Sequence, residues 1–429
     1  MLDLANNQYL NKLDKAKPIV LGLSGGVDSM VLFDLLRKQG FDVIIAHVNH
    51  HKRKQSEIEE KYIKELAIKL NSKIEVLNFF YNGEENFQAL AHDKRYEFFY
   101  DVFKKYDASS IITAHHGIDN LETIIMNIIK GSNLFGYGGI KELSSYKDAP
   151  LIRPLLRYDK KEFYKYALKN DITYFEDSTN QEDEYLRNRI RHHIIPLMQK
   201  ENPNLISSIS NYSKQVFGAF TFIREISVKY VKENNNKINV ISFLKLAPIL
   251  QKDIINYLFD ENGITSSENK INDIIELMNN NKPNLSYDLG NNYRFVKSYD
   301  ECYLTEIIDT PEIREEINLY DTLILNDYGS FFFRRTLPKD STSFIRISIN
   351  EKFPLVIRHR KYGDKILIGN GHKKLKDFLI DRKIPKDKRD SILVVTNAVD
   401  EILWVVGEYR KPCDNEDAIN FIFEEKNNE

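Results

Sequence analysis

The sequence predicts an α/β fold in three parts: an N-terminal domain built on a parallel sheet, a helical middle domain and a small α+β C-terminal domain. Strand-like and helix-like segments alternate between about residues 17 and 115, which is typical of βαβ units that cover both faces of a sheet. Helical periodicity dominates from about 204 to 280, and short strand-like runs follow from about 284. A chain of 429 residues is long enough for several domains.

In the N-terminal part, short apolar runs indicate the strands and longer amphipathic runs indicate the helices between them. The expected strands are Ile19–Leu23, Val43–His47, Ile74–Leu77 and Ser110–Ala114. The expected helices are Asp28–Gln39, Ser56–Leu70, Glu84–Tyr106 and Asp119–Lys130. Ligands of open parallel sheets bind beyond the carboxyl ends of the strands, so the loops at 24–29, 47–51 and 114–122 are expected to share one crevice.

Farther along, apolar residues at helical spacing predict a long helix near Pro196–Ala219 that leads into a helical module. Further helical segments are expected at Phe243–Leu258 and Ile271–Leu277. Strand-like runs follow at Tyr293–Val296, Thr322–Leu325, Phe344–Ile349 and Ile392–Val395. The expected division of the chain is 1–200, 201–300, a connecting segment at 301–340, and 341–429.

The composition narrows the class of protein. The formal net charge is −2, yet residues 331–389 hold 17 Lys and Arg against 6 Asp and Glu, a local net charge of +11. Such a basic region is typical of a surface for a phosphate-rich partner, or of a face balanced by acidic neighbours. The two cysteines, Cys302 and Cys413, support neither a disulfide framework nor a cysteine zinc site. No apolar run is long enough for a membrane span, so we expect a soluble cytoplasmic protein.

The turn between the first strand and the first helix is the most informative motif. Its glycines let the backbone curl and present N–H groups beside a helix N-terminus, which favours a phosphate ligand. No Lys follows the second glycine, so this is not the Walker phosphate loop. The pattern S-G-G-x-D-S instead resembles the loop of the ATP pyrophosphatases, which split ATP into AMP and pyrophosphate; the alternative is an ordinary βα turn. The residues expected to bind ATP are Ser24, Gly25, Gly26, Val27, Asp28 and Ser29.

A histidine-rich stretch, His47–His51, follows the second predicted strand and continues into Lys52 and Arg53. Its H-x-x-H spacing raises the possibility of a metal site. No third ligand lies at a convincing spacing, so contact with a nucleotide is the better interpretation of this basic and polar loop.

Two carboxylates and two histidines follow the fourth predicted strand. Asp119 and Glu122 are three residues apart at a predicted helix N-terminus, where they share a face and are favoured as anions. They could bind a substrate amine or hold Mg²⁺, and the alternative for Asp119 is helix capping. Successive side chains of an extended chain alternate in direction, so only one of His115 and His116 is expected to face the crevice. A neutral histidine there could serve as a general base, or simply pack.

A third group of polar residues comprises Asp177–Asn180 and the run Tyr185–Arg191. Arg187 and Arg191 are four residues apart on a predicted helix and could clamp a phosphate from one face. Alternatively they pair in a structural network with nearby acidic residues, namely Asp177, Glu182 or Asp183.

Taken in order, these motifs resemble the tRNA(Ile)-lysidine synthetase family of the PP-loop ATP pyrophosphatases. The resemblance extends over about 180 residues of the N-terminal part. It comprises SGGVDS at 24–29, HVNH at 47–50, Ala91–Tyr96, the stretch 113–123, KGSNLFGYGGI at 130–140, IRPLL at 152–156 and the stretch 177–191. Three segments at the other end, 358–364, 373–376 and 384–389, resemble the C-terminal module of the family.

The resemblance implies an enzyme that joins free L-lysine to carbon 2 of the wobble cytidine in a CAU-anticodon tRNA(Ile), so that the tRNA reads AUA instead of AUG. ATP would first adenylate the base, with release of pyrophosphate, and AMP would leave when lysine attacks. It also implies a PP-loop domain at 1–200, a substrate-binding domain at 201–300 and a tRNA-binding domain at 341–429.

The same resemblance assigns roles to individual residues. Asp28 lies near Mg²⁺, His115 belongs to the catalytic residues, and Asp119 and Glu122 recognise the lysine amine. The substrate-binding residues would further include Arg95, Arg187, Asn188, Arg191, Arg358, Lys373, Lys374 and Lys376.

The chain departs from the family pattern at three positions. His92 stands where arginine is common, and Asn120 stands where glutamine is common. Ile118 replaces the first of two aspartates, so no metal can bind through that carboxylate. Rival functions are a tRNA thiolase, an amide-forming ATP pyrophosphatase and a noncatalytic tRNA-binding protein. The thiolase needs reactive cysteines near the site, and no glutaminase half accompanies this domain. The sequence leaves both a monomer and a homodimer open.

Overall fold

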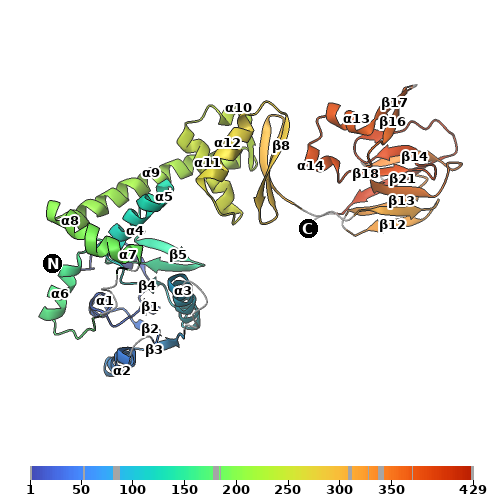
Figure 1. Cartoon of the computed structure of the whole chain (residues 1–429). Coiled ribbons are helices and arrows are strands. Elements are labelled where there is room, and N and C mark those ends of the chain that lie inside the picture. Colours follow the sequence, from blue (N-terminus) through green and yellow to red (C-terminus); the bar gives the residue numbers. More distant parts are fainter. Residues whose placement is uncertain are drawn as a thin grey trace. The chain divides into compact units, whose positions relative to one another are not determined.

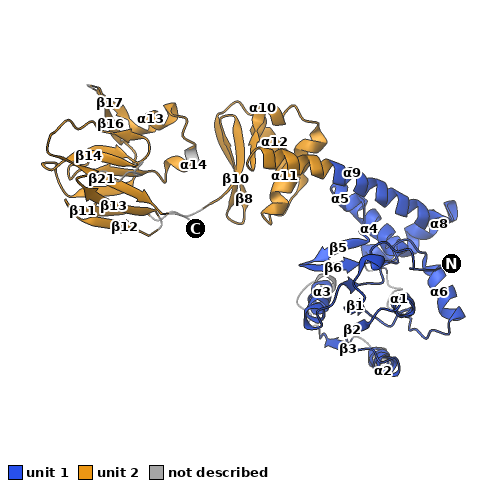
Figure 2. Cartoon of the chain, turned by 180° about the vertical axis from the view of Figure 1, so that it is seen from behind, with its two compact units in different colours: residues 1–222 blue, residues 223–429 orange. Residues whose placement is uncertain are grey.

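The computed structural model of the chain forms two compact units, Met1–Phe222 and Ile223–Glu429 (Figures 1 and 2). The residues that the structure describes are 2–51, 54–80, 87–176, 183, 185–307, 312–326, 328–336, 343–369 and 371–426. Of the helices in these ranges, none combines the length and the apolar character needed to cross a membrane.

The first unit is built on a six-stranded sheet of order β3-β2-β1-β4-β6-β5. All neighbouring strands are parallel except the β5–β6 pair. The strands are β1 (Ile19–Gly22), β2 (Val43–Asn49), β3 (Ile74–Asn78), β4 (Ile111–Ile112), β5 (Leu143–Tyr146) and β6 (Ala149–Ile152). The predicted parallel-sheet fold is confirmed. The strand order reverses between β1 and β4, which is where such sheets bind ligands.

Helices cover both faces of this sheet because alternate strand residues point to opposite sides. In β1, Ile19 and Leu21 join one apolar core, and Val20 joins another. The first core is completed by α1 (Val27–Lys38), α2 (Lys54–Lys69) and α6 (Lys160–Lys169), and the second by α3 (Phe87–Lys105). At the end of β1, a Cβ on Gly22 would lie 2.6 Å from the ring of Phe99, so glycine permits this close approach of α3.

Further helical segments of the first unit include α4 and the helices that pack against it. A small apolar cluster joins α4 to the helices that follow α6, and it includes Leu121, Ile190, Ile195 and Leu205. These helices are α4 (Gly117–Lys130), α5 (Leu134–Tyr137), α7 (Leu186–Arg189), the π-helical turn η3 (Ile190–Ile194), α8 (Ile195–Glu201) and α9 (Leu205–Glu233). The single helix predicted near Pro196–Ala219 is wrong: it is divided between α8 and α9. Pro203 has no backbone N–H to continue the ladder.

The second unit begins with helices packed on a four-stranded antiparallel sheet of order β7-β10-β9-β8. Its elements are β7 (Lys237–Asn239), α10 (Val240–Phe243), α11 (Pro248–Glu261), α12 (Glu268–Asn279), β8 (Asn284–Gly290), β9 (Tyr293–Ser298) and β10 (Glu301–Glu306). The predicted helices are present, and the strands complete their core.

Two antiparallel sheets share the last large core, which contains Trp404 and Phe331. One sheet has the order β11-β15-β18-β19-β20 and the other β12-β13-β21-β14. Their strands are β11 (Arg314–Ile317), β12 (Thr322–Leu325), β13 (Gly329–Arg334), β14 (Phe344–Ser348), β15 (Leu355–His359), β18 (Leu393–Thr396), β19 (Ile402–Val405), β20 (Tyr409–Arg410) and β21 (Ala418–Glu425). Between β15 and β18 lie a hairpin and two helices: β16 (Lys365–Ile368), β17 (Gly371–Lys374), α13 (Leu375–Asp381) and α14 (Lys386–Arg389). Ile366, Leu375 and Leu379 of this segment form a separate apolar cluster with residues of β18 and β19. The expected connecting segment 301–340 thus supplies β10 and β11–β13, because their apolar residues are needed in these cores.

Candidate active site

The loop between β1 and α1 is a tight turn held by its own serines. Gly25 has φ +89°, a conformation that residues with a Cβ rarely adopt, and its carbonyl accepts a hydrogen bond from Phe175 N at 3.0 Å. The hydroxyls of Ser24 and Ser29 lie 3.1 Å apart, and Ser29 Oγ donates to Gly26 O at 3.0 Å. Helix α1 starts at Val27, so its first N–H groups lack partners within the helix. The turn is therefore preformed for an anion.

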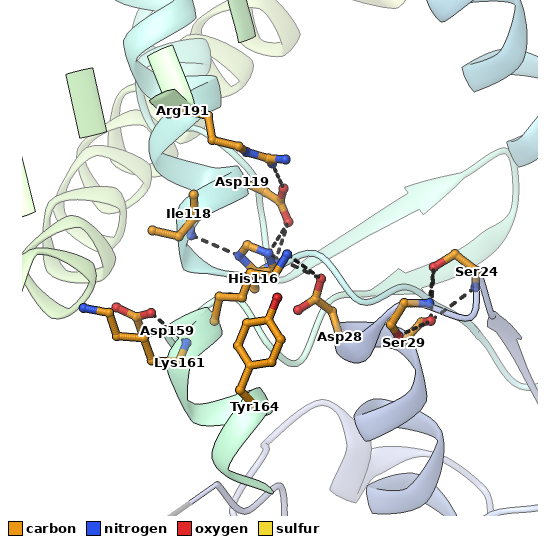
Figure 3. Close-up of polar contacts among 12 residues, drawn as sticks. Ser24, Asp28, Ser29, His116, Ile118, Asp119, Asp159, Lys161, Tyr164 and Arg191 are labelled. Carbon is orange, nitrogen blue, oxygen red and sulfur yellow. Dashed lines mark hydrogen bonds and ion pairs between the residues drawn. The ribbon is translucent and has the colours of Figure 1, made fainter. Parts of the chain in front are cut away.

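Asp28 lies in the first turn of α1 and faces two groups from other elements (Figure 3). Its Oδ2 is 3.7 Å from His116 Nε2 and 3.9 Å from Lys160 Nζ. Its Oδ1 is buried and has no hydrogen-bond partner among the described residues. Burial raises the pKa of Asp28 above its ordinary value, and His116 and Lys160 only partly oppose this. The free oxygen marks a position for a cation or a donor that arrives with a ligand.

His116 connects α4 to this carboxylate. It is the N-cap of α4, and its Nδ1 accepts a hydrogen bond from Ile118 N at 3.2 Å. An accepting Nδ1 has no proton, so the ring proton is on Nε2. That nitrogen faces Asp28 and also lies 3.6 Å from Asp119 Oδ2. His116, which the sequence named only as the alternative to His115, is thus the histidine between the two carboxylates.

His115 lies on the other side of the chain, where its Nδ1 is 2.9 Å from Thr113 Oγ1. Burial lowers the pKa of His115 to about 4, and the positive charges of Arg153, Arg187 and Arg95 add to this against the attraction of Asp119. The ring is therefore neutral near pH 7.

Asp119 and Glu122 are paired with two arginines of the segment 185–191. Glu122 is fully buried; its Oε2 accepts from Arg187 Nε and its Oε1 from Arg191 Nε, each at 2.5 Å. Asp119 Oδ1 accepts from Arg187 Nη2 at 3.0 Å and lies 3.4 Å from Arg191 Nη2. Burial opposes ionisation of Asp119, but its interactions with His116, His115 and Arg187, together with the hydrogen bond from His116 N, prevail and lower its pKa to about 2.

This network differs from the pairings that the sequence suggested for the arginines. Asp183 instead contacts His192 and His193 at 2.7 and 2.5 Å. The residues Asp177–Asn180 and Glu182, like Lys52 and Arg53, lie outside the described residues. Asn188 is half-buried in α7 beside the two arginines.

Other predicted residues surround this centre. Arg95, on α3, is half-buried; its Nη2 lies 3.5 Å from His50 Nε2, and no carboxylate of the described residues forms an ion pair with it. His47 is buried, and its Nδ1 donates to Leu23 O at 2.8 Å. The described residues hold no group of three or more His, Cys, Asp or Glu side chains that could bind a metal ion.

Two of the departures from the family pattern, Ile118 and His92, have different surroundings. Ile118 packs against the apolar cluster of α4, η3 and α9, and Figure 3 shows its side chain directed away from Asp28. His92 is exposed on α3, 3.3 Å from Asp93, and its ring lies beside Tyr96.

The basic residues of the second unit divide into buried and exposed ones. Arg358 is 1% exposed and donates to Asp364 at 2.8 Å and to Asp400 at 3.0 Å, so its guanidinium belongs to the interior. We therefore assign Arg358 a structural role instead of a contact with substrate. Lys373 pairs with Asp381 across the β16–β17 hairpin and α13, whereas Lys374 and Lys376 are exposed.

Sequence reasoning missed Lys160 and Tyr164, both on α6. A signal was present: Asp159 and Glu162 form a capping box, which fixes the start of α6 at Lys160, after the segment that follows β6. The start of α6 could thus have been predicted from the D-x-x-E spacing. The position of Lys160 beside Asp28 could not, because it depends on the packing of α6 against α1.

Two family models match parts of the chain. Residues 2–198 match the model of a PP-loop domain, and residues 355–413 match that of the TilS substrate C-terminal domain. Among solved structures, the TilS C-terminal domain shares 24% identity with a TM-score of 0.24, covering 27% of this chain and 99% of its own. The U34-tRNA thiolase NcsA from Methanococcus maripaludis shares 18% identity with a TM-score of 0.42, covering 48% of this chain and 73% of its own.

Curated relatives match nearly the whole chain. The tRNA(Ile)-lysidine synthase of Enterococcus faecalis is 32% identical over 425 residues, 90% of each chain. The tRNA(Ile)-lysidine synthase of Streptococcus sanguinis is 31% identical over 403 residues, 91% of each chain. With a PP-loop domain around its Ser24–Ser29 turn and this similarity over nine-tenths of its length, the chain belongs to the tRNA(Ile)-lysidine synthase family of ATP-dependent ligases.

Proposed function

We propose that this enzyme uses ATP to join L-lysine to carbon 2 of the wobble cytidine in a CAU-anticodon tRNA(Ile). The observation that carries the proposal is the similarity to tRNA(Ile)-lysidine synthases over 90% of the chain. The S-G-G-V-D-S turn, which includes Asp28, lies with His116 and Asp119 at the switch point of the sheet and supplies a place for the reaction.

In the first step, cytosine O2 attacks the α-phosphorus of ATP, and the bond to the pyrophosphate oxygen breaks. The turn would bind the phosphates through its N–H groups and serine hydroxyls. Mg²⁺ fits beside Asp28, because one buried carboxylate oxygen is free and Mg²⁺ commonly uses a single carboxylate together with substrate phosphates. When bound, the ion would offset phosphate charge.

In the second step, the ε-amine of lysine attacks carbon 2, and the bond to the AMP oxygen breaks. We assign Asp119 to the amine, because its side chain is 14% exposed whereas Glu122 is fully buried. Glu122 then holds Arg187 and Arg191 in place through its ion pairs with them. Arg95, which has no carboxylate partner among the described residues, is available for the α-carboxylate of lysine.

The amine must be neutral to attack, so a proton has to leave it. His115 is neutral near pH 7 and is the candidate acceptor, although a pKa of about 4 makes it a weak base for an ammonium group. A tRNA thiolase activity is disfavoured, because neither Cys302 nor Cys413 belongs to the first unit. Burial also raises the pKa of the Cys302 thiol to about 12.

The direct test incubates the full chain with ATP, Mg²⁺, labelled lysine and an unmodified tRNA(Ile) transcript. Label should enter the RNA at the wobble cytidine, one AMP should form per lysine, and a tRNA(Met) transcript should stay unlabelled. The Asp119→Asn variant should raise the KM for lysine more than that for ATP. ATP cleavage without lysine transfer would contradict the proposal.

A further inference from the structure

Lys160 is held at the edge of the ATP loop by a rigid helix start. Asp159 caps α6: its Oδ1 accepts from Lys161 N at 3.0 Å, and its N–H donates to Glu162 Oε1 at 3.2 Å. One turn on, Phe163 is fully buried in the core that α6 shares with α1. The first residue of α6 therefore has a fixed position relative to the turn at Ser24–Ser29.

Within the part of the chain that the structure describes, the ammonium group of Lys160 makes only loose contacts. Its closest carboxylate among the described residues is Asp28, at 3.9 Å, which is too far for a hydrogen bond. It lies 5.9 Å from the ring centre of Tyr164, one turn along α6, and its side chain is 38% exposed. Figure 3 shows Tyr164 directed toward Asp28 and His116, so α6 presents this side to the site.

Two other cations of the site, Arg187 and Arg191, are already paired with carboxylates. Arg187 and Arg191 each contact both Asp119 and Glu122 at 3.4 Å or less. A polyphosphate that enters the turn meets the N–H groups of α1 and the Asp28 carboxylate, which repels it. Among the described residues, Lys160 is the cation at this carboxylate that can turn to a phosphate without breaking a hydrogen-bonded ion pair.

We propose that Lys160 binds the triphosphate of ATP, exchanging its distant pairing with Asp28 for direct contact with phosphate oxygens. The exchange would leave Asp28 for the magnesium ion that accompanies the nucleotide. A lysine from α6 thus supplies the charge that the loop lacks after its second glycine. This inference rests on the proposed use of ATP, and it adds a nucleotide-binding residue that lies well outside the loop motif.

The chain offers a matched control in the neighbouring lysine. Lys161 is exposed and takes part in the capping box only through its backbone N–H. Lys160→Ala and Lys161→Ala therefore remove the same charge from the same helical turn. Lys160→Met keeps most of the aliphatic side chain, and Lys160→Arg keeps the positive charge.

The experiment measures binding of α,β-methylene-ATP with Mg²⁺ to the full chain by calorimetry. We expect about 10-fold weaker binding for Lys160→Ala and Lys160→Met, consistent with the removal of one charge-assisted hydrogen bond. Lys160→Arg should stay within about 3-fold of the unaltered enzyme, and Lys161→Ala should not differ from it. Circular dichroism of each variant verifies that the fold is kept.

Equal affinity of Lys160→Met and the unaltered chain would overturn this inference, as would an equal loss in Lys161→Ala. The lysine-transfer assay on the unaltered chain separates the two proposals. If lysine does not enter tRNA but nucleotide binding still depends on Lys160, the proposed function fails and the assignment of Lys160 stands.

Discussion

His116 serves two purposes through the two nitrogens of its ring. Nδ1 accepts from the backbone at the start of α4, and Nε2 directs its proton toward Asp28 and Asp119. The same side chain therefore starts the helix that bears Asp119 and reduces the repulsion between two carboxylates from different elements. Replacing His116 should therefore affect both the start of α4 and the repulsion between Asp28 and Asp119.

His116→Ala should weaken the start of α4 by about 1 kcal/mol, the usual effect of removing an N-cap acceptor. His116→Asn retains a cap acceptor and should recover most of this loss. The measurement is hydrogen exchange of peptides from α4 in both variants. Equal protection of α4 in His116→Ala and the unaltered protein would show that the cap contributes nothing.

The titration of His115 gives a prediction about pH. Its pKa in the folded protein is about 4, below the ordinary value of 6.5, because burial penalises the imidazolium and three arginines repel it. The folded state thus binds fewer protons here than the unfolded state between pH 6.5 and 4. The contribution of neutral His115 to the free energy of unfolding is therefore complete above pH 6.5 and is lost progressively as the pH falls toward 4.

NMR of the protein with ¹³C-labelled histidine can follow the titration directly, and His115→Gln identifies the signal. We expect a midpoint of about pH 4 for His115. A midpoint near 6.5 would mean that the ring is well hydrated, and His115 would then be partly charged when lysine binds.

At the scale of the elements, β1–β4 could be predicted because each is a short apolar run between polar turns, whereas β5 and β6 are not among the expected strands. The start of α1 was equally clear from the glycine turn. The pairing of Glu122 with Arg187 could not be predicted, since 65 residues separate them and only the packing of η3 and α8 on α4 brings them together. The approach of Lys160 to Asp28 similarly follows from the α1–α6 contact, which no local pattern specifies.

Asn120 connects α4 to two other segments through its amide. Its Nδ2 donates to Ser213 Oγ on α9 at 3.0 Å, and its Oδ1 accepts from Ile140 N at 2.7 Å. Because Asn120 is buried, Asn120→Ala leaves the backbone donor at Ile140 without its partner, which typically costs about 1–3 kcal/mol.

Hydrogen exchange of peptides covering 131–141 and α9 should therefore become faster in Asn120→Ala. Ser213→Ala breaks only the weaker of the two hydrogen bonds and should have the smaller effect. If Ser213→Ala loosens residues 131–141 as much as Asn120→Ala does, the hydrogen bond to Ile140 is not what holds that loop.

At the scale of the whole molecule, the only tryptophan reports on the second unit. Trp404 lies fully buried in the core of the two antiparallel sheets, and Arg358 is on β15 of the same sheet as Trp404. Arg358→Ala would leave the Asp364 carboxylate, itself 8% exposed, without its main partner.

Removing one partner of a buried ion pair typically costs about 3–5 kcal/mol, so the urea transition seen by Trp404 fluorescence should move to a clearly lower midpoint in Arg358→Ala. Arg360→Ala is the control, because its partner Asp390 is mostly exposed. If the midpoint for Arg358→Ala is as high as that for Arg360→Ala, Arg358 has no structural role and is a candidate for substrate binding.

We propose that the basic region at 331–389, with its net charge of +11, is the surface for the body of the tRNA. Arg358 belongs to the interior and Lys373 has an acidic partner, so Lys374 and Lys376 remain as the exposed charges of this predicted set. A lysine that binds a phosphate releases a counterion from the RNA, so removing such a lysine should reduce the salt dependence of binding.

Lys374→Glu combined with Lys376→Glu should weaken tRNA binding and lower the slope of log K against log salt by about 1 for each lysine that binds a phosphate. Affinity for α,β-methylene-ATP should not change, because these residues lie in the second unit and the proposed nucleotide loop in the first. Lys229→Glu with Lys232→Glu changes the net charge equally on exposed positions of α9 and serves as the control. Binding measured from low to moderate salt distinguishes the two pairs. If both pairs lower affinity and slope alike, long-range charge governs the association and the hairpin around Lys374 does not bind phosphate directly.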